Sequence, residues 1–444
     1  MNLSHNKSPY LLPLIAFLVI IAPSLLSHGM FFDGLTYASI SRNLSVGDGD
    51  FFHLYYTRAH SEVFYDHPPL FFWIQSFFFS ALGDHWWVEK LFCAVFFLIN
   101  AILLVNVSAM FQKHFYGKII SSWPVVLLWL LVPITFWIYK NNVLEILLTT
   151  FTLLSLLCFA RMLFSQGVIL GVACIFGYSF FIFCACLTKG PVGLFPLAVP
   201  AIYILLKRNE GIKKVLVFYV VAAVFLFLLS LMIYLNDDFR EYFTRYFSGQ
   251  VEKSLSGERE NASFRFKTFT DVLFNFFFPL FYSLIFILIF RQWKNVKWKK
   301  PGKPVWFFLL VSLSASLPVL ISPKQREMYI APAMPYFVLA VFFYFRENWD
   351  SISVKINTRN AKWILRLLTV TGLIYAAAYT GKVSRDREII NRAQEFRDLL
   401  PYGSSLCVDD KQYGDWKLHA YFQRYHGLVL ERKTEENNCI TELK

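Results

Sequence analysis

The sequence predicts an all-α polytopic membrane protein that ends in a small α/β tail. Of its 444 residues, 56% are hydrophobic and 19% are aromatic, whereas a soluble domain has about 45–50% apolar residues. The excess is concentrated in runs of about 18–24 residues, which are long enough to cross a bilayer as helices. Positively charged residues fall in alternate loops between these runs, which is the pattern that orients membrane helices.

The apolar runs predict about eleven transmembrane helices, each close to the length that a bilayer requires. Their residues are 10–27, 87–111, 119–138, 145–163, 168–188, 191–206, 215–235, 270–290, 304–321, 328–345 and 362–380. The stretch 68–83 is apolar but short. We therefore place it as a helix at the membrane interface, within a long first loop at residues 28–86.

The net charge of +13 indicates membrane topology and contact with lipid phosphates. No basic helix or aromatic–basic repeat accompanies it, which argues against nucleic acid as a partner. With the spans above, the most basic loops share one side, which we predict to be cytoplasmic; they are residues 113–118, 207–214, 291–303 and 346–362. Counting 68–83 as a full span would turn loop 291–303 outward, so we reject that alternative.

The tail, residues 381–444, is predicted to be a small extracytoplasmic domain, separate from the transmembrane domain at residues 1–380. "SSLCVDD" and "HGLVLER" are typical of strands, and "WKLHAYFQRYH" between them of a helix. Cys407 and Cys439 could form a disulfide if the tail faces an oxidising compartment. The tail contains no catalytic motif.

Two acids stand at the predicted outer ends of helices. Asp33 follows the first span, in "FFDGLTYASISRNL", and Glu145 lies in "WIYKNNVLEILLTT" with apolar neighbours on both sides. A carboxylate at a membrane edge is costly to desolvate and is commonly functional. The alternatives are structural: Asp33 could cap a helix that starts at Gly34, and Glu145 could be an acid favoured by the helix dipole.

Cations gather on the same predicted side. Lys189 lies between two spans in "CLTKGPVGLFPLAVP", Lys324 and Arg326 begin a span in "SPKQREMYIAPAMPYF", and loop 236–268 carries both signs of charge. Lysine at a helix end can also simply snorkel to water. Carboxylates can take a proton from an attacking hydroxyl, and Lys or Arg can stabilise a phosphate leaving group. Together the two sets predict group transfer from a lipid-linked phosphate.

Five segments carry a resemblance to a known family. "FFDGLTYASISRNL", "FYDHPPLFFWIQSFFF", "NNVLEILLT", "LTKGPVGLFPLAVP" and "SPKQREMYIAPAMPYF" occur in the order and spacing of GT-C glycosyltransferases. The chain most resembles the type that includes aminoarabinose transferases and dolichyl-phosphate-mannose–protein mannosyltransferases. The resemblance covers about residues 10–345 and leaves the tail out.

Such enzymes take a sugar from a polyprenyl-phosphate donor and attach it to an acceptor on the extracytoplasmic side. The resemblance implies that Asp33 is the catalytic base and that Glu145 is the second acid of the site. It implies donor-phosphate contacts for Lys189, and for an arginine-bearing loop where Arg259 and Arg265 are the candidates. Lys324 and Arg326 are further candidates for holding the phosphate.

The segment "FYDHPPLFFW" departs from the family pattern. Asp66-His67-Pro68-Pro69 stands where the family has Glu-Lys-Pro-Pro. Lysine is a fixed cation, whereas histidine is largely neutral at pH 7 unless a phosphate or carboxylate raises its pKa. We expect Asp66 at the edge of the site, His67 near the phosphate, and the apolar residues after the prolines as a wall beside the isoprenoid.

The sequence thus predicts an inverting glycosyltransferase of the bacterial inner membrane, with its site facing the periplasm or exterior. The acceptor would be a lipid, a glycan or a protein. No cofactor is required, although a divalent metal is compatible with the chemistry. The alternative is a transporter or flippase of a lipid-linked substrate, but such proteins usually show inverted repeats and helices broken at mid-membrane, and the sequence contains neither signal.

The alternation of basic loops predicts that Gly249, Ser254 and the tail around Asp409 face the exterior, and that Lys297 faces the cytoplasm. Single cysteines at these positions, in a background without native cysteines, can be treated on intact cells with a membrane-impermeant maleimide. We expect labelling at positions 249, 254 and 409. Labelling of position 297 but not 254 would reverse the orientation.

Overall fold

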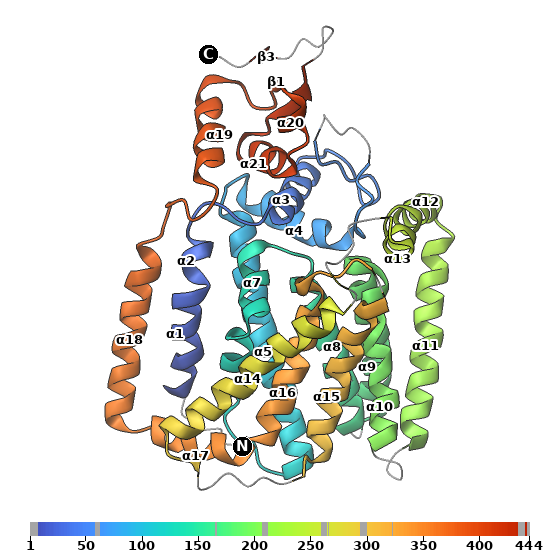
Figure 1. Ribbon diagram of the computed structural model, residues 1–444. Coiled ribbons are helices and arrows are strands. Elements are labelled where there is room, and N and C mark those ends of the chain that lie inside the picture. The colour runs from blue at the N-terminus through green and yellow to red at the C-terminus, as the bar shows by residue number, and fades with distance from the viewer. Residues whose placement is uncertain are drawn as a thin grey trace.

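Helices dominate the structure, a computed structural model in which residues 8–57, 63–164, 167–206, 212–258, 264, 266–293, 300–321, 323–433 and 440–441 are described. Figure 1 shows long helices side by side, with shorter elements and the tail at one end. The bundle helices are α1 (Leu11–Ile20), α5 (Val88–Tyr116), α6 (Trp123–Leu130), α7 (Pro133–Asn141), α8 (Glu145–Phe164), α9 (Val168–Lys189), α10 (Ala198–Leu206), α11 (Ile212–Tyr234), α14 (Lys267–Ile289), α15 (Lys303–Ser316), α16 (Met334–Tyr344) and α18 (Arg359–Ala377).

Further elements connect the bundle helices and carry most of the polar residues discussed below. They are α2 (Ala22–Leu25), α3 (Phe32–Ser45), α4 (Leu70–Leu82), the 3-10 helix η2 (Gly190–Leu197), α12 (Asp237–Tyr246), α13 (Lys253–Ser256), the 3-10 helix η6 (Glu327–Ala333) and α17 (Arg346–Ile356). Figure 1 shows α2, α3, α4, α12 and α13 toward the end of the bundle that bears the tail, and α17 at the opposite end.

Each of the predicted spans contains helix, and the all-α polytopic class is confirmed. Within the described ranges, seven helices are long and apolar enough to cross a membrane, or eight if α6 and α7, bent by 75°, form one span. The total of about eleven spans stays a prediction. The short apolar stretch after the prolines forms α4, which has 13 residues and lies across the top of the bundle in Figure 1.

The end of the bundle opposite the tail joins two of the predicted basic regions. Lys118 forms an ion pair with Asp350 at 2.8 Å. The guanidinium of Arg346 lies over the ring of Tyr116, 4.4 Å from its centroid. Residues 113–118 and α17 therefore meet at the same end, as the alternation of charge predicts.

The bundle core is rich in buried aromatic side chains. Trp123, Trp129 and Trp349 are fully buried. Phe97 stacks on Trp129 with ring centroids 5.3 Å apart, and the indole nitrogen of Trp123 donates to the hydroxyl of Ser353 at 2.8 Å. Large rings fill volume with few rotatable bonds, so this core holds the helix ends in fixed relative positions.

The start of α3 is held tightly against the corner between α7 and α8. A Cβ on Gly34 would lie 2.0 Å from the carbonyl oxygen of Asn141, so only glycine fits there. Asn142 has a φ of 52°, a left-handed conformation that Asn tolerates better than most residues. Its side-chain nitrogen donates to the carbonyl oxygen of Gly34 at 3.0 Å. The "NN" pair thereby fixes α3 directly beside the start of α8.

The tail contains the elements that its sequence predicts. Strand β1 (Ser405–Val408) pairs in parallel with β2 (Val429–Arg432) and with β3 (Ile440–Thr441). The predicted helix is α21 (Trp416–His426), which accompanies α19 (Arg387–Leu399) and α20 (Asp410–Tyr413). Cys407 is disulfide-bonded, and Cys439 lies outside the described residues. The division into two domains at residue 380 stays a prediction.

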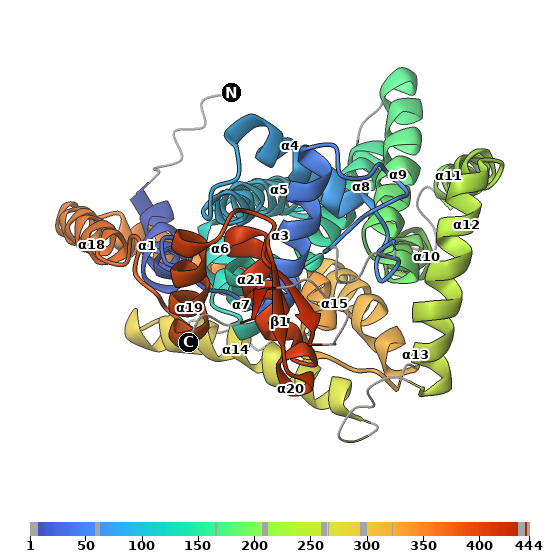
Figure 2. The ribbon, with the colours of Figure 1, turned by 90° about the horizontal axis from the view of Figure 1, so that it is seen from above.

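Seen from the tail side in Figure 2, the tail covers the middle of the bundle, with α1 and α18 at one edge and α11 at the other. Its helix α21 lies against α3, and the buried Met30, Leu35, Ile390, Ala420 and Tyr421 form one apolar cluster between them. The tail therefore rests on the same helix whose first turn carries Asp33.

We expect Gly34→Ala to destabilise the protein, because the added methyl group collides with backbone that cannot rotate away. Overpacking of this kind costs about 1–3 kcal/mol. Thermal unfolding in detergent would measure the loss. Gly171→Ala is the matched control: a Cβ there meets nothing within 4 Å and alanine is the better helix former. Equal unfolding temperatures for the two variants would contradict the close approach.

Candidate active site

Four charged side chains from the predicted outer face meet where helices end. Asp33 lies in the first turn of α3, Glu145 is the first residue of α8, Lys189 is the last residue of α9, and Arg326 directly precedes η6. Acids at helix N-termini and a cation at a C-terminus are each favoured by the helix dipole. The fold thus brings together in space residues that are far apart in the sequence.

Lys189 and Glu145 form an ion pair that is almost completely buried. The ammonium group donates to the Glu145 carboxylate, and the two side chains are only 9% and 2% exposed, respectively. Lys189 also lies over the ring of Tyr329, 4.4 Å from its centroid. A buried charge without a partner is strongly unfavourable, so each member holds the other at this depth.

Asp33 is paired more loosely and stands inside its helix. Its Oδ2 lies 3.6 Å from Nη1 of Arg326, and the side chain is 19% exposed. The helix begins at Phe32, with Phe31 as its N-cap residue. The alternative in which Asp33 caps a helix starting at Gly34 is therefore wrong. The carboxylate is therefore available for a role other than capping the N-terminus of the helix.

The surroundings of Asp33 move its pKa toward neutrality. Burial raises the pKa of this carboxyl from 3.8 to about 6, and the negative charge of Glu145 adds to the rise. Arg326, Lys324 and Lys189 act in the opposite direction, with Arg326 the strongest of the three. A carboxyl with a pKa near 6 is ionised at neutral pH and still able to accept a proton, as a general base requires.

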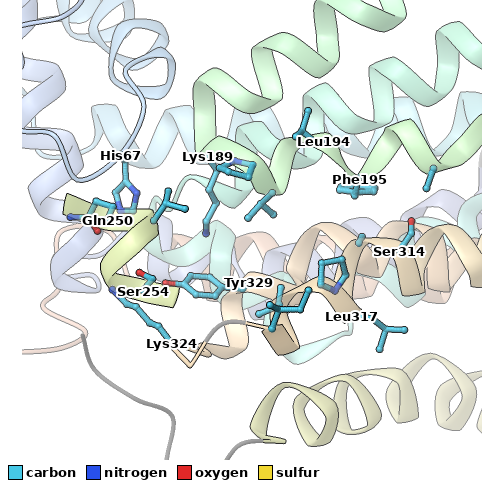
Figure 3. Close-up of a pocket in the computed structure, with 18 of the residues that line it drawn as sticks. His67, Lys189, Leu194, Phe195, Gln250, Ser254, Ser314, Leu317, Lys324 and Tyr329 are labelled. Atoms are coloured by element: carbon cyan, nitrogen blue, oxygen red, sulfur yellow. The ribbon is translucent and has the colours of Figure 1, made fainter. Parts of the chain in front are cut away.

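A cavity of about 1030 Å³ lies beside this cluster. Figure 3 shows its two ends. The polar end is lined by His67, Lys189, Gln250, Ser254, Lys324 and Tyr329. The apolar end is lined by residues of η2, α15 and the turn after α15, including Leu194, Phe195, Leu313 and Leu317. This division into a polar and an apolar end suits an amphipathic ligand whose charged group is an anion.

The Asp66-His67-Pro68-Pro69 segment forms one edge of the cavity. The side-chain amide of Gln250 donates to the Asp66 carboxylate. The hydroxyl of Tyr242 lies 2.7 Å from the carbonyl oxygen of His67, and the His67 ring packs edge-on against Tyr37, with centroids 5.5 Å apart. Pro69 directly precedes α4 as its N-cap residue. The imidazole of His67 thus lines the cavity, and its contact with a phosphate stays a prediction.

A second cavity, of about 560 Å³, is lined by the two residues that precede Asp33 and by Arg326, which pairs with Asp33. Four of its lining residues are aromatic, Phe31, Phe32, Phe136 and Trp137, and its charged members are Arg326 and Glu327. Lys324 lines the first cavity and Arg326 the second, so two cations only two residues apart serve different spaces. Asp33 follows Phe31 and Phe32 directly and contacts Arg326, which places it next to the second cavity.

Some predicted residues are not brought into this picture. Arg259 and Arg265 lie outside the described residues. Within the described ranges, no group of three or more His, Cys, Asp and Glu side chains is arranged to hold a metal ion. The divalent metal that the sequence allows therefore has no such group there.

Sequence reasoning missed Tyr329, Gln250 and Ser254, which line the polar end of the cavity. Tyr329 lies in the same motif as Arg326, three residues later, so helical spacing could have suggested it. Gln250 and Ser254 lie in the charge-dense loop where only arginines were considered. A polar uncharged residue in such a loop gives no signal of its own, because its role depends on what packs opposite.

Comparisons with known proteins concern the family and the fold of the chain. Residues 66–234 match the sequence model of the dolichyl-phosphate-mannose-protein mannosyltransferase family. No curated protein is significantly similar in sequence to the chain.

The fold is shared with ArnT from Cupriavidus metallidurans, solved bound to undecaprenyl phosphate: identity is 18%, the TM-score is 0.64, and the match covers 94% of this chain and 84% of that one. The apo form of ArnT matches with a TM-score of 0.63, at 18% identity over 94% of this chain and 83% of that one. The oligosaccharyltransferase AglB from Archaeoglobus fulgidus, solved with an inhibitory peptide and a dolichol-phosphate, is 11% identical with a TM-score of 0.51 over 96% of this chain and 64% of that one. Together the family match over residues 66–234 and the shared fold confirm the predicted resemblance to GT-C glycosyltransferases.

Proposed function

We propose that the protein transfers a sugar from a polyprenyl-phosphate donor to a hydroxyl of a lipid, glycan or protein acceptor, with inversion at the anomeric carbon. The observation that carries this proposal is the cavity of about 1030 Å³, which has cations at one end and apolar walls at the other. A lipid phosphate has the same two parts. The reaction takes place on the extracytoplasmic face of a bacterial inner membrane, which is the face toward the periplasm.

The donor binds with its phosphate between Lys189, Lys324 and His67 and its first isoprene units along Leu194 and Leu317. Lysine binds phosphate as a point charge, and it does so most strongly where water is excluded. ArnT, which shares the fold, has been solved with undecaprenyl phosphate bound, which supports a lipid of this class. The remainder of a long isoprenoid lies in the surrounding bilayer. Arg259 and Arg265 stay candidates for further phosphate contacts.

The acceptor approaches through the aromatic cavity beside Asp33. Its hydroxyl gives a proton to the Asp33 carboxylate while its oxygen attacks the anomeric carbon of the sugar. The bond between that carbon and the phosphate oxygen breaks, and polyprenyl phosphate leaves with the electron pair. A single displacement of this kind inverts the configuration of the anomeric carbon. Arg326 holds the Asp33 carboxylate in place before the proton arrives.

Glu145 acts on both halves of this reaction. Its ion pair holds the Lys189 ammonium group beside the cavity, and its negative charge raises the pKa of Asp33. Both effects favour transfer, since the phosphate needs a cation and the acceptor hydroxyl needs a base that accepts protons readily. Glu145 itself need not exchange a proton with substrate.

Asp33→Asn should reduce turnover by about 10²–10⁴-fold, the usual effect of losing a general base, while undecaprenyl phosphate still binds. In the wild type, turnover should fall as the pH drops through about 6, because the pKa of Asp33 is raised to about 6 and protonation removes the base. Initial rates with a labelled undecaprenyl-phosphate sugar between about pH 5 and 8 would measure both effects.

Stability separates loss of chemistry from loss of fold in this experiment. A carboxyl whose pKa is raised on folding contributes its full stabilisation of the folded state below its unfolded pKa of 3.8, and that contribution is lost as the pH rises through about 6. At pH 7.5 the Asp33→Asn variant should therefore unfold at a higher temperature than the wild type. If the Asp33→Asn variant turns over the donor at the wild-type rate, Asp33 is not the base.

Lys189→Met should weaken binding of undecaprenyl phosphate and also destabilise the fold, because it leaves Glu145 buried without a partner. Breaking a buried pair in this way costs about 3–5 kcal/mol. The double variant Glu145→Gln with Lys189→Met should recover most of the stability but none of the binding. Thermal unfolding and equilibrium binding of the lipid would measure the two properties separately.

Lys140→Met provides the matched control. Lys140 lies near the same end of the bundle, at the C-terminus of α7, with its ammonium 5.0 Å from the centroid of the Phe136 ring, and it does not line the large cavity. Its loss should leave lipid binding unchanged. If the double variant binds undecaprenyl phosphate as well as the wild type, Lys189 does not hold the phosphate.

A further inference from the structure

The link between α2 and α3, residues 26–31, carries the chain from the bundle into the helix that bears Asp33. Its backbone is held by side chains from distant parts of the sequence, including two tyrosines of the C-terminal tail. We propose that the tail is part of the transfer apparatus, and that Tyr421 and Tyr425 are positioning residues that hold Asp33 in place. This inference rests on the proposed function of Asp33 as the base.

Tyr421 binds the backbone three residues before Asp33. Its hydroxyl accepts a hydrogen bond from the amide of Met30 at 3.3 Å, and it lies 3.0 Å from the carbonyl oxygen of the same residue. The same hydroxyl lies 2.8 Å from Oδ2 of Asp386. Asp386 is itself held by Lys417 at 2.9 Å. Tyr421 is fully buried, so its hydroxyl has no bulk water to exchange these partners for.

Tyr425 binds the preceding residues, one helical turn further along α21. Its hydroxyl accepts from the amide of Gly29 at 3.1 Å and lies 3.3 Å from Nδ1 of His28. His28 also bridges to Val383 in the strand-like segment that leads into the tail. Two tyrosines four residues apart share one face of a helix, and here that face meets three consecutive residues of the link.

Helix α21 is itself firmly seated, so its tyrosines can act as fixed points. Arg424 donates to both oxygens of Glu89, at 3.1 and 2.8 Å, and to Asp84 at 2.7 Å. Arg42, near the other end of α3, donates to the backbone carbonyl of Gln423 at 2.9 Å. Arg42, Glu89 and Arg424 are buried. The tail therefore grips α3 near both of its ends.

The bundle holds the same link from the opposite side. Lys90 donates to the carbonyl oxygen of Gly29 at 3.1 Å, and the amide of Phe31 donates to the side chain of Asn141 at 2.8 Å. Gly29 is thus contacted by both the tail and the bundle, Met30 by the tail, and Phe31 by the bundle. Asp33 follows within one helical turn, so a shift of the link moves the carboxylate relative to the donor and the acceptor.

Tyr421→Phe and Tyr425→Phe test this arrangement, because each removes only one hydroxyl group. A misplacement of about 1 Å can lower a rate by about 10²-fold. We expect the double variant to lose turnover of the labelled undecaprenyl-phosphate sugar by about 10- to 100-fold. Affinity for undecaprenyl phosphate should not change, because neither tyrosine lines the large cavity. Hydrogen exchange at the amides of Gly29 and Met30 should become faster.

Tyr413→Phe is the matched control, since this tyrosine of the tail packs against His419 and Arg432. It should change neither turnover nor exchange at residues 29 and 30. Turnover in the double variant equal to that of the control would overturn the inference. So would an equal loss of turnover and lipid affinity, because a general structural defect affects both. A wild type that turns over no polyprenyl-phosphate sugar would instead refute the proposed function, and faster exchange in the variants would still show that the tyrosines hold the link.

Discussion

The buried ion pair between Lys189 and Glu145 is the interaction on which the site depends. It joins the end of α9 to the start of α8 at a depth where neither charge could stand alone. Because both helix ends are fixed, Lys189 presents its ammonium to the large cavity from a constant position beside Tyr329. The same pair places a negative charge close enough to Asp33 to contribute to its raised pKa. In the proposed mechanism, one contact therefore couples the cation that holds the phosphate to the base on another helix.

The two cavities follow from the way that helix ends meet around this pair. The large cavity has its charged end at Lys189 and its apolar end between η2 and α15, a division that suits an amphipathic anion. The aromatic cavity is lined by Phe31 and Arg326, and Arg326 contacts Asp33. In the proposed mechanism the base is thereby next to the cavity through which the acceptor enters.

Patterns that are local in the sequence predicted most of the fold. Apolar runs located the bundle helices. The pattern of apolar and polar residues located the strands β1 and β2 and the helix α21 between them. Asp33, Glu145 and Lys189 were found because charges at the edges of apolar runs are conspicuous. The docking of α21 on α3 could not be predicted, since Tyr421 and Arg424 find their partners nearly 400 and more than 300 residues away. Tyr329 and Gln250 were missed for the same reason, because uncharged polar residues acquire a role only through packing.

The hold on α3 has a physical reason that extends beyond its local contacts. Burial raises the pKa of Asp33 and so works against its ionised form, which means that the folded protein keeps this carboxylate in an unfavourable place. An unfavourable group moves toward water unless its backbone is fixed. The close contact of Gly34 with Asn141, the hydrogen bonds from Tyr421 and Tyr425 and the ion pair of Arg424 with Glu89 all oppose that movement. The packing of the tail and the bundle thereby keeps the Asp33 carboxylate mostly shielded from water.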